Sequence, residues 1–228
     1  MKIALIPAKQ KSLRLPNKNF KLFFGKPMIE HILTEIKNSN YFDKIVISSD
    51  NLNLKKKLFY KKFIISKRPN KLTKNDVGLY EIIKHEYKIF LKDNLKIEEL
   101  WLFLPCSPLI IKKDILEAAK IFKKNKKFPL MSVAKFPVPV EWAMYENNGY
   151  LSPVSKKKVN MDSKKLRPHY YDSGNFIVYS KLHLNQFSKK FKYKKYLIPN
   201  HKAVDIDTIE DWKLTKILFK NLKNVKSQ

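Results

Sequence analysis

Short apolar segments alternate with amphipathic segments along most of the chain, and this alternation restricts the fold more than any other feature. Residues 2–7 form an apolar run that ends at proline, and residues 44–49 form a second run of the same kind. Such runs are typical of parallel strands that are buried on both faces. Between them, apolar residues recur at helical spacing from Pro27 to Ile36, and proline is favoured at the first position of a helix. Strands that alternate with helices predict an α/β fold with a mostly parallel sheet.

The same alternation continues toward the C-terminus. Further strands are predicted at residues 62–66, 99–104, 129–134 and 175–179. Further helices are predicted at residues 52–60, 77–91, 114–122 and 208–222, with a helix or turn after Ser180. The residues after Lys223 are predicted to fray. The sequence has no internal repeat, so we expect a single domain over residues 1–228, long enough to bury a substantial core.

Residues 136–171 depart from this rhythm. Short apolar stretches separated by prolines replace the helical pattern, and the Asn148-Gly149 pair is typical of the tight turn in a β-hairpin. We therefore expect a β-rich insert within the single domain, with the strand-and-helix pattern resuming after it.

The net charge of +28 at pH 7 favours an anionic partner, and strongly basic chains often bind nucleic acid. However, the lysine runs at residues 55–57, 123–127 and 156–158 are far apart and are not interleaved with aromatic residues. Lysine also outnumbers arginine along the whole chain, which indicates biased residue usage rather than a polyanion site. The charge alone leaves open an alternative from a different functional class, a basic nucleic-acid-binding protein without catalytic activity.

Cysteine content and hydropathy predict the compartment. Cys106 is the only cysteine, which excludes an internal disulfide and a thiolate-rich zinc site within one chain. The sequence has no run of about 18 apolar residues, and its first ten residues lack the apolar segment of a signal peptide. We therefore expect a cytoplasmic protein without membrane insertion.

A polar loop rich in cations, residues 8–19, follows the first predicted strand. In open α/β sheets, ligands bind outside the carboxyl ends of the strands. The cations of this loop recur every few residues and could surround the oxygens of a triphosphate. An ordinary solvated lysine loop would have the same composition. The cations are Lys9, Lys11, Arg14 and Lys18.

Two carboxylates, Asp205 and Asp207, lie shortly before the last predicted helix. In an extended segment they would project to one side, and their oxygens would suit Mg²⁺ that is also held by phosphate oxygens. The alternative is structural. Asp207 or Thr208 would then be the N-cap of the helix, and Glu210 and Asp211 would stabilise its first turn.

Three further segments carry candidate residues. They are Leu104-Pro-Cys-Ser-Pro-Leu109, Arg68-Pro-Asn-Lys-Leu72 and Tyr171-Asp-Ser-Gly-Asn-Phe176. Taken alone, the first is a proline-rich turn, and Arg68 could simply pair with a carboxylate. The third is the start of a strand, where Gly174 would permit a close approach of the backbone.

These segments, together with residues 12–19 (Ser-x-Arg-Leu-Pro-x-Lys-Asn), occur in the order found in a known enzyme family. The chain resembles the cytidylyltransferases that activate 3-deoxy-2-keto sugar acids, which include CMP-sialic acid, CMP-pseudaminic acid and CMP-Kdo synthetases. Residues 136–143 (Phe-Pro-Val-Pro-Val-Glu-Trp-Ala) are closer to the pseudaminic acid branch. The chain departs from the family pattern at three positions. The family usually has arginine where Lys9 stands, a small residue or asparagine where Lys11 stands, and often a lysine where Leu13 stands.

The resemblance implies a Rossmann-like, three-layer nucleotidyltransferase fold in which residues 136–171 form a small β-rich dimerisation arm beside the sugar pocket. It implies transfer of CMP from CTP to the anomeric hydroxyl of a nonulosonic acid, with release of pyrophosphate. Pseudaminic acid is the acceptor that the resemblance favours. A sialic, legionaminic or Kdo acceptor, or another nucleotide, would also suit these motifs. The implied partners are CTP, an acidic nine-carbon sugar and a second copy of the chain.

The resemblance also implies roles for individual residues. Lys18, Arg14 and Asp207 would act in catalysis, while Asp205 and Asp207 would hold Mg²⁺ as the cofactor. Substrate-binding roles are implied for Lys9, Ser12, Asn19, Arg68, Cys106, Ser107, Asp172, Gly174 and Asn175.

Overall fold

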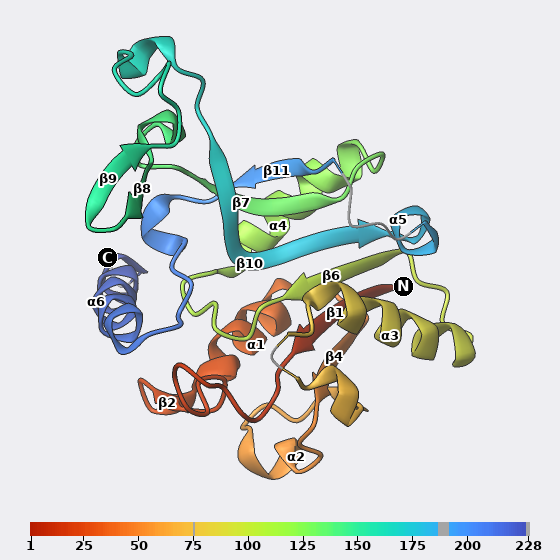
Figure 1. Cartoon of the computed structure of the whole chain (residues 1–228). Coiled ribbons are helices and arrows are strands. Elements are labelled where there is room, and N and C mark those ends of the chain that lie inside the picture. Colours follow the sequence, from red (N-terminus) through yellow and green to blue (C-terminus); the bar gives the residue numbers. More distant parts are fainter. Residues whose placement is uncertain (75, 187–191, 227–228) are drawn as a thin grey trace.

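A computed structural model describes residues 1–74, 76–186 and 192–226, and it has a sheet of seven strands at its centre (Figure 1). The strand order is β11-β7-β10-β6-β1-β4-β5. The strands are β1 (Lys2–Pro7), β4 (Lys44–Ser49), β5 (Ile64–Lys67), β6 (Glu99–Phe103), β7 (Leu130–Lys135), β10 (Tyr170–Ser180) and β11 (Lys194–Leu197). The strands β1, β4, β5 and β6 run parallel, and β11 runs parallel to β7. The predicted mostly parallel sheet is confirmed.

β10 is the exception, because it runs antiparallel to both of its neighbours, β6 and β7. The sequence predicted a strand only at residues 175–179 and expected it to resume the parallel pattern, which is wrong in length and direction. The physical reason is the connection. No crossover helix separates β7 from β10, so the chain returns from the insert at the edge where β7 ends. The register between β10 and β7 shifts between Asp172 and Ile177, which marks an irregularity in the strand.

Helices cover both faces of this sheet and complete three layers. They are α1 (Met28–Ser39), α2 (Leu54–Lys57), α3 (Leu79–Lys92), α4 (Lys112–Lys124), α5 (Lys181–Asn185) and α6 (Ile209–Lys226). Ala4 and Ile6 of β1 pack in the same buried cluster as α1 and α4, whereas Ile3 and Leu5 pack with α3. This alternation is expected of a strand that is buried on both faces. The predicted three-layer architecture is confirmed.

A third apolar cluster holds α6. The Phe23 ring, in the short ladder of β2 (Leu22–Phe23) and β3 (Lys26–Pro27), lies 5.2 Å from the rings of Trp212 and Phe219. Phe23 and Trp212 are buried. Because α6 follows the acidic segment directly, these edge-on ring contacts help to fix the position of Asp205 and Asp207.

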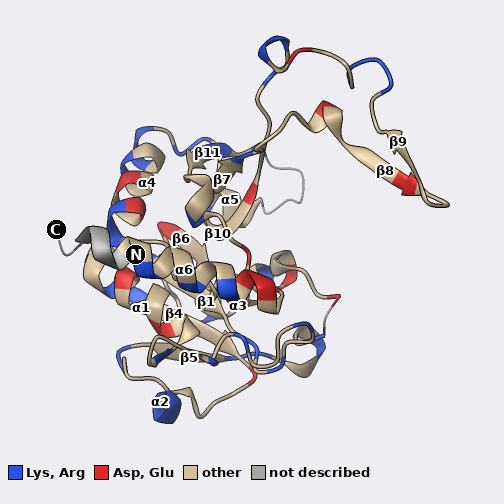
Figure 2. Ribbon diagram, turned by 90° about the vertical axis from the view of Figure 1, so that its left-hand side faces the viewer, with Lys and Arg blue, Asp and Glu red and all other residues tan. Residues whose placement is uncertain are grey.

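The insert projects away from the sheet and carries a hairpin (Figures 1 and 2). β8 (Met144–Asn147) pairs with β9 (Tyr150–Pro153), and the turn residues Asn148 and Gly149 have φ angles of 50° and 81°. The predicted hairpin is confirmed, because asparagine and glycine tolerate this left-handed conformation best. The 3₁₀ turns η2 (Val140–Trp142) and η3 (Ser163–Lys165) precede and follow the hairpin. We call residues 136–171 the arm.

Predictions for short and polar elements were less accurate. α2 spans Leu54–Lys57 only, where a helix over residues 52–60 was predicted, because lysines surround its few buried side chains. β2 and β3 were not predicted because each has only two residues. β11 was not predicted because it includes two lysines and shows no apolar run. Pro27 is the N-cap of α1 rather than its first helical residue.

The C-terminal helix is longer than predicted. α6 extends to Lys226, past the point where fraying was expected, and the last two residues of the chain lie outside the described ranges. None of the helices in those ranges combines the length and apolar character needed to cross a bilayer.

Candidate active site

The cation-rich loop, residues 8–19, leaves the C-terminal end of β1 with a defined shape. The Ala8 N–H donates to the Ser48 carbonyl at 2.9 Å, and the Gln10 N–H donates to the Asp50 carboxylate at 2.7 Å. These bonds hold the start of the loop against the end of β4. Further along, the buried side chain of Leu15 packs into the cluster that holds α6. The loop therefore differs from a freely solvated lysine segment.

Asp207 joins this loop to the segment before α6. Arg14 Nη2 lies 2.6 Å from Asp207 Oδ2, and Lys18 Nζ donates to Asp207 Oδ1 at 2.8 Å. Lys18 Nζ also donates to the carbonyl of Ile206 at 2.8 Å. The Arg14 side chain is 71% exposed, while those of Lys18 and Asp207 are both 22% exposed. Lys18 is thus the anchored partner of Asp207, and Arg14 is the partner nearer to solvent.

Thr208 and Asp211 cap the start of α6. Asp211 Oδ2 accepts from the backbone N–H groups of Asp207 and Thr208 at 3.0 and 2.8 Å. In return, the Asp211 N–H donates to Thr208 Oγ1 at 3.2 Å. This reciprocal pair satisfies donors that a helix start would otherwise leave open. The interpretation of this segment as a helix cap is therefore correct for Thr208 and Asp211, but the carboxylates of Asp205 and Asp207 take no part in the cap.

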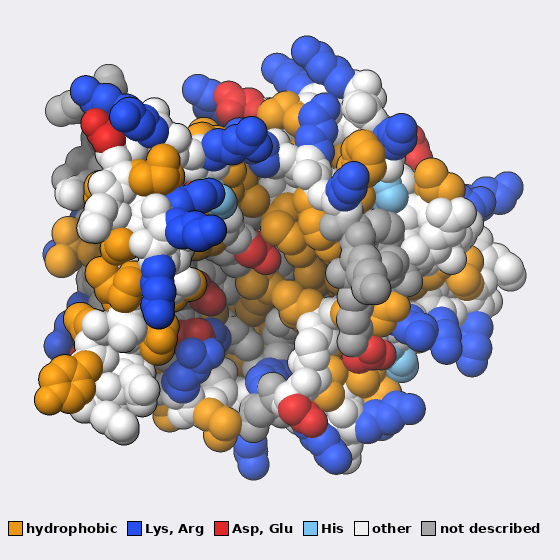
Figure 3. Space-filling model, turned by 45° about the horizontal axis from the view of Figure 1, so that its top comes forward, with side chains coloured by type: hydrophobic (Ala, Val, Ile, Leu, Met, Phe, Trp, Pro, Cys, Tyr) orange, Lys and Arg blue, Asp and Glu red, His pale blue; other side chains and the backbone are white. Residues whose placement is uncertain are grey.

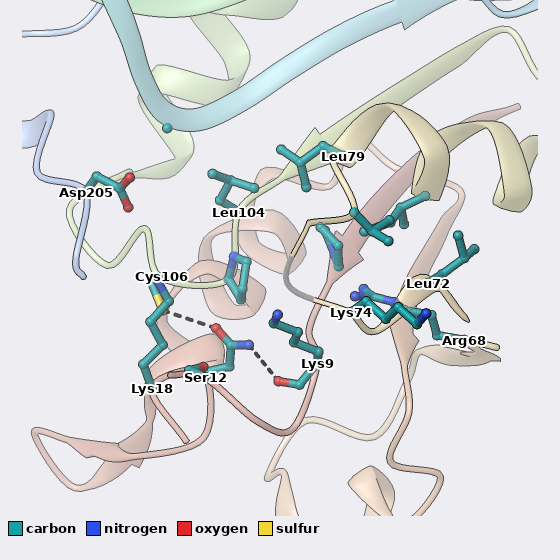
Figure 4. A pocket seen from close by; sticks show the side chains of 16 residues that line it. Lys9, Ser12, Lys18, Arg68, Leu72, Lys74, Leu79, Leu104, Cys106 and Asp205 are labelled. Atoms are coloured by element: carbon teal, nitrogen blue, oxygen red, sulfur yellow. Dashed lines mark hydrogen bonds between the residues drawn. The ribbon is translucent and has the colours of Figure 1, made fainter. Parts of the chain in front are cut away.

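Asp205 faces a cavity at the carboxyl edge of the sheet (Figure 4). Desolvation raises the pKa of its carboxyl group, and the charge of Asp207 adds to that shift. A methyl group added to Gly174 would lie 3.7 Å from Asp205 Cγ and 3.7 Å from Leu104 Cδ1. Gly174 also has a φ of 65°, which favours glycine. The backbone of β10 therefore lies beside this carboxylate. The sequence predicted that Gly174 would permit a close approach, and the structure identifies Asp205 and Leu104 as its neighbours.

A chain of hydrogen bonds connects the exit of β6 to the cation-rich loop. The Cys106 thiol donates to Asn19 Oδ1 at 3.3 Å, and Asn19 Nδ2 donates to the Lys9 carbonyl at 2.9 Å. Burial raises the pKa of Cys106 to about 12, so the thiol keeps the proton that it donates. Cys106 and Asn19 are both buried. Besides lining the cavity, these two side chains hold the loop in place.

Arg68 lies on the opposite wall of the cavity, between β5 and the 3₁₀ turn η1 (Asn70–Leu72) (Figure 4). Its Nη2 donates to the Ser48 carbonyl at 2.8 Å, and its Nε donates to Ser48 Oγ at 3.3 Å. Burial lowers the pKa of Arg68, and the carboxylates of Asp50 and Glu86 oppose this shift. Within the described ranges, Arg68 forms no ion pair with a carboxylate. Its position favours the interpretation as a cavity residue.

The cavity brings together most of the residues that the sequence singled out. Figure 4 shows Asp205, Cys106 and Lys18 on one side, and Arg68 with Lys74 on the other. The predicted site residues that line the cavity are Lys9, Ser12, Lys18, Asn19, Arg68, Cys106, Gly174 and Asp205.

Other predicted residues lie outside the cavity lining, and they are Arg14, Ser107, Asp172, Asn175 and Asp207. Ser107 is buried, and its hydroxyl has no hydrogen-bond partner in the described part of the chain. Asp172 Oδ1 accepts from the Gly174 N–H at 2.9 Å, and desolvation raises the pKa of this carboxyl group. Asn175 is buried, with its amide donating to the Ser173 carbonyl at 3.1 Å. In this arrangement Asp172 and Asn175 shape the irregular part of β10.

Comparison with known proteins shows which enzymes the chain is similar to. Residues 3–89 match the family model described as cytidylyltransferase, a range that includes the cation-rich loop and Arg68. The chain is 28% identical over 222 residues to the pseudaminic acid cytidylyltransferase of Campylobacter jejuni subsp. jejuni serotype O:2, with 96% of each chain covered. The resemblance to cytidylyltransferases is confirmed.

Two further comparisons concern the sequence of a second relative and a solved structure. The N-acylneuraminate cytidylyltransferase of Escherichia coli O18:K1:H7 is 25% identical over 232 residues, a match that covers 97% of this chain and 52% of the relative. A solved CMP:2-keto-3-deoxy-manno-octonic acid synthetase complexed with CTP superposes with a TM-score of 0.68 at 14% identity, covering 96% of this chain and 98% of that one. Similarity at this level of identity supports the fold, and the predicted nucleotidyltransferase fold is confirmed.

Some residues that line the cavity were not assigned from sequence. They are Pro7, Leu72, Lys74, Val77, Leu79, Ile82, Leu104 and Pro105. Leu72, Leu104 and Pro105 lie inside segments that the sequence had marked, so their proximity to the site could have been inferred. Lys74 and Leu79 belong to no motif, and only the path of the chain between η1 and α3 brings them to the cavity.

The carboxylate pair also fits the divalent cation implied by the cytidylyltransferase resemblance. Asp205 and Asp207 present hard oxygen donors, which Mg²⁺ prefers. In the portion of the chain that the structure describes, no three His, Cys, Asp or Glu side chains form a group that could hold a metal by themselves. Mg²⁺ commonly takes one or two carboxylates and completes its shell with phosphate oxygens and water. Two carboxylates therefore suffice when a triphosphate lies beside them.

Proposed function

We propose that this protein is a Mg²⁺-dependent cytidylyltransferase that transfers CMP from CTP to the anomeric hydroxyl of a nonulosonic acid. The observation that carries the proposal is the meeting of the cation-rich loop with the acidic segment beside one cavity: Lys18 and Asp205 line the cavity, and Lys18 also binds Asp207, which lies outside the lining. Full-length similarity to a pseudaminic acid cytidylyltransferase favours pseudaminic acid as the acceptor. Because CTP is a cytoplasmic nucleotide, we place the reaction in the cytoplasm.

The proposed reaction forms one bond and breaks one bond at the α-phosphorus of CTP. The anomeric oxygen of the sugar acid attacks this phosphorus and releases its proton to solvent water, while the bond to the bridging oxygen breaks and pyrophosphate leaves. An in-line displacement of this kind depends on positioning and on charge stabilisation. Mg²⁺ held by Asp205 and Asp207 would neutralise charge on the phosphate oxygens.

The loop residues suit the triphosphate. Lys18 and Arg14 place positive charge beside the carboxylate pair, and Lys9 and Ser12 line the same cavity. A lysine at position 9 keeps the charge of the arginine usual in the family but lacks its planar, bidentate geometry. Leu13 is 75% exposed and offers no donor, so the remaining cations must bind the phosphates without it.

The opposite wall suits the base, and the β10 side suits the sugar. Arg68 and Lys74 offer donors next to the apolar side chain of Leu79. Leu104 and Gly174 border the cavity on the side where β10 leads back from the arm. Acceptors of the sialic, legionaminic or Kdo type are the alternatives, because relatives named for these sugar acids also match the chain.

The nucleic-acid alternative is weakened by where the lysines lie. The three lysine runs belong to α2, to the end of α4 with the residues after it, and to the arm, which are separate parts of the molecule (Figure 2). On the face seen in Figure 3, Lys and Arg side chains are spread around a hollow that contains hydrophobic and acidic side chains. A binding site for duplex DNA would instead gather cations into one continuous stripe.

Pyrophosphate release from each of the four nucleoside triphosphates, measured with a panel of sugar acids, tests the proposal. We expect release from CTP with pseudaminic acid to exceed release in every other combination. Preference for a sialic, legionaminic or Kdo acceptor would keep the reaction and change the substrate. Absence of release from CTP with every acid, together with duplex binding that weakens steeply as salt rises, would favour the nucleic-acid alternative.

We further propose that two copies of the chain form a homodimer through the arm. Tyr150, Leu151 and Val154 are 78%, 71% and 64% exposed. Neighbouring apolar side chains that remain in solvent mark a surface for association. The hairpin pairs only with itself in the described ranges, so a second copy is the occupant that the family resemblance supports.

A further inference from the structure

The ion pairs of Asp207 bear on the order in which ligands bind, and this inference rests on the proposed function. We propose that Arg14 is a gate on the carboxylate pair. In the nucleotide-free protein Arg14 occupies Asp207, and it leaves Asp207 when its guanidinium group binds the triphosphate. The Asp205/Asp207 site then binds a divalent cation tightly only together with the nucleotide.

The geometry shows that both oxygens of Asp207 are already in use. Oδ2 lies 2.6 Å from Arg14 Nη2, and Oδ1 accepts from Lys18 Nζ at 2.8 Å. A metal ion bound here would compete with these two cations for the same lone pairs and would be repelled by their charge. Asp205 alone is a single carboxylate, which is a weak site for a divalent cation.

The two cations differ in how firmly they are held. Lys18 is mostly buried and has a second acceptor, the Ile206 carbonyl, at 2.8 Å. Arg14 is 71% exposed, and among the described residues its side chain forms an ion pair with Asp207. Ion pairs of exposed side chains are weak and are readily exchanged. Arg14 is therefore the cation that can move, and Lys18 keeps Asp207 in place.

A triphosphate provides the competing partner for Arg14. A guanidinium group binds phosphate oxygens through paired, charge-assisted hydrogen bonds. Its departure frees Asp207 Oδ2 for the cation, and the phosphate oxygens supply further ligands. Binding free energies are reciprocal, so the nucleotide should tighten metal binding by the same factor by which the metal tightens nucleotide binding.

Mn²⁺ binding to the nucleotide-free protein, followed by electron paramagnetic resonance, tests the gate directly. We expect Arg14→Gln to bind Mn²⁺ roughly two- to fivefold more tightly than the wild type, the upper part of the range expected for loss of one exposed ion pair. The matched control is Lys11→Gln, which removes one charge from an exposed position of the same loop. This control should stay within about twofold of the wild type, because only the general field changes. Equal affinities in Arg14→Gln and Lys11→Gln would overturn the gate.

Two companion measurements separate this inference from the proposed function. With a non-hydrolysable CTP analogue present, the advantage of Arg14→Gln should disappear, since Arg14 has already left Asp207 in the wild type. Asp207→Asn should lose the nucleotide-free Mn²⁺ site in the Arg14→Gln background, and its retention would place the ion elsewhere and refute the gate. Pyrophosphate release from CTP is assayed separately. If the wild type releases pyrophosphate but Arg14→Gln and the wild type bind Mn²⁺ equally, only the gate is refuted. If Arg14→Gln binds Mn²⁺ more tightly but the wild type releases no pyrophosphate, only the proposed reaction is refuted.

Discussion

The cavity and the arm satisfy their side chains in different ways. Around the cavity, polar groups find partners within the chain, as in the pairing of Lys18 with Asp207 and of Cys106 with Asn19. In the arm, apolar side chains such as Tyr150 and Leu151 remain 78% and 71% exposed. The difference teaches that one chain can assemble the proposed nucleotide site, whereas the exposed apolar surface of the arm is where the proposed dimer would form.

The largest effect should come from Asp207→Ala, which attacks the cavity side of this comparison. The variant removes a proposed metal ligand and the partner of Lys18, so pyrophosphate release should fall by at least about 100-fold. The cap made by Thr208 and Asp211 does not use the Asp207 carboxylate, so the melting temperature should change little. Initial rates and thermal unfolding measure both effects. Wild-type rates in the folded variant would remove Asp207 from the mechanism.

The arm side is tested by Leu151→Asp. A charge placed within an apolar interface is costly, so the variant should be a monomer in light scattering at micromolar concentration, where we expect the wild type to be a dimer. The control is Leu91→Asp on α3, since Leu91 is also exposed, at 50%, but lies outside the arm. A dimeric Leu151→Asp variant, or a monomeric wild type, would contradict the role proposed for the arm.

Gly174→Ala sharpens the description of the cavity. A side chain at a φ of 65° costs about 1 kcal/mol, which should lower the melting temperature by roughly 2–4 °C. The new methyl group would also lie beside Asp205, so the KM of the proposed transfer reaction should rise. Gly25→Ala is the control, because Gly25 has a similar φ of 76° with no atom within 4 Å of the added methyl group. Equal effects of both substitutions on KM would show that strain alone is responsible.

The smallest effect should come from Asp205→Asn, which is expected to raise the stability of the folded protein slightly in metal-free buffer. The pKa of Asp205 is raised in the folded protein, so the native state holds this proton more tightly than the unfolded state does. Stability contributed by this group therefore falls as the pH rises from about 3.9, the usual value for aspartate, through the raised value. Asp205→Asn should melt at a higher temperature than the wild type at pH 7, with no such gain at pH 3. A lower melting temperature at pH 7 would show that Asp205 is stabilised by its surroundings.

Local sequence patterns predicted the parts of the fold that depend on local physics. Runs such as residues 2–7 and 44–49 became β1 and β4, because a strand buried on both faces must be apolar throughout. The direction of β10 was missed, since it depends on the absence of a crossover helix and not on its own residues. β11 was missed because residues 194–197 include two lysines and show no apolar run.

Individual site residues show the same division. The sequence placed Arg14, Lys18, Asp205 and Asp207 in the site through motifs and resemblance. It did not predict that Arg14 and Lys18 would both bind Asp207, which follows Lys18 by 189 positions. It assigned Cys106 to substrate binding, whereas the structure also uses the thiol to hold Asn19.

By itself, the sequence of this protein determined its α/β class, the position of its arm and the candidate segments that the structure brings to the cavity, because periodicity, turn residues and motifs are properties of neighbouring residues. The tertiary structure alone decided how those segments meet. Which cation reaches Asp207, which wall holds Arg68 and how β10 approaches Asp205 depend on packing between distant parts of the chain. Packing of α6 against Phe23 and of the cation-rich loop against β4 sets those distances, and no local pattern encodes them.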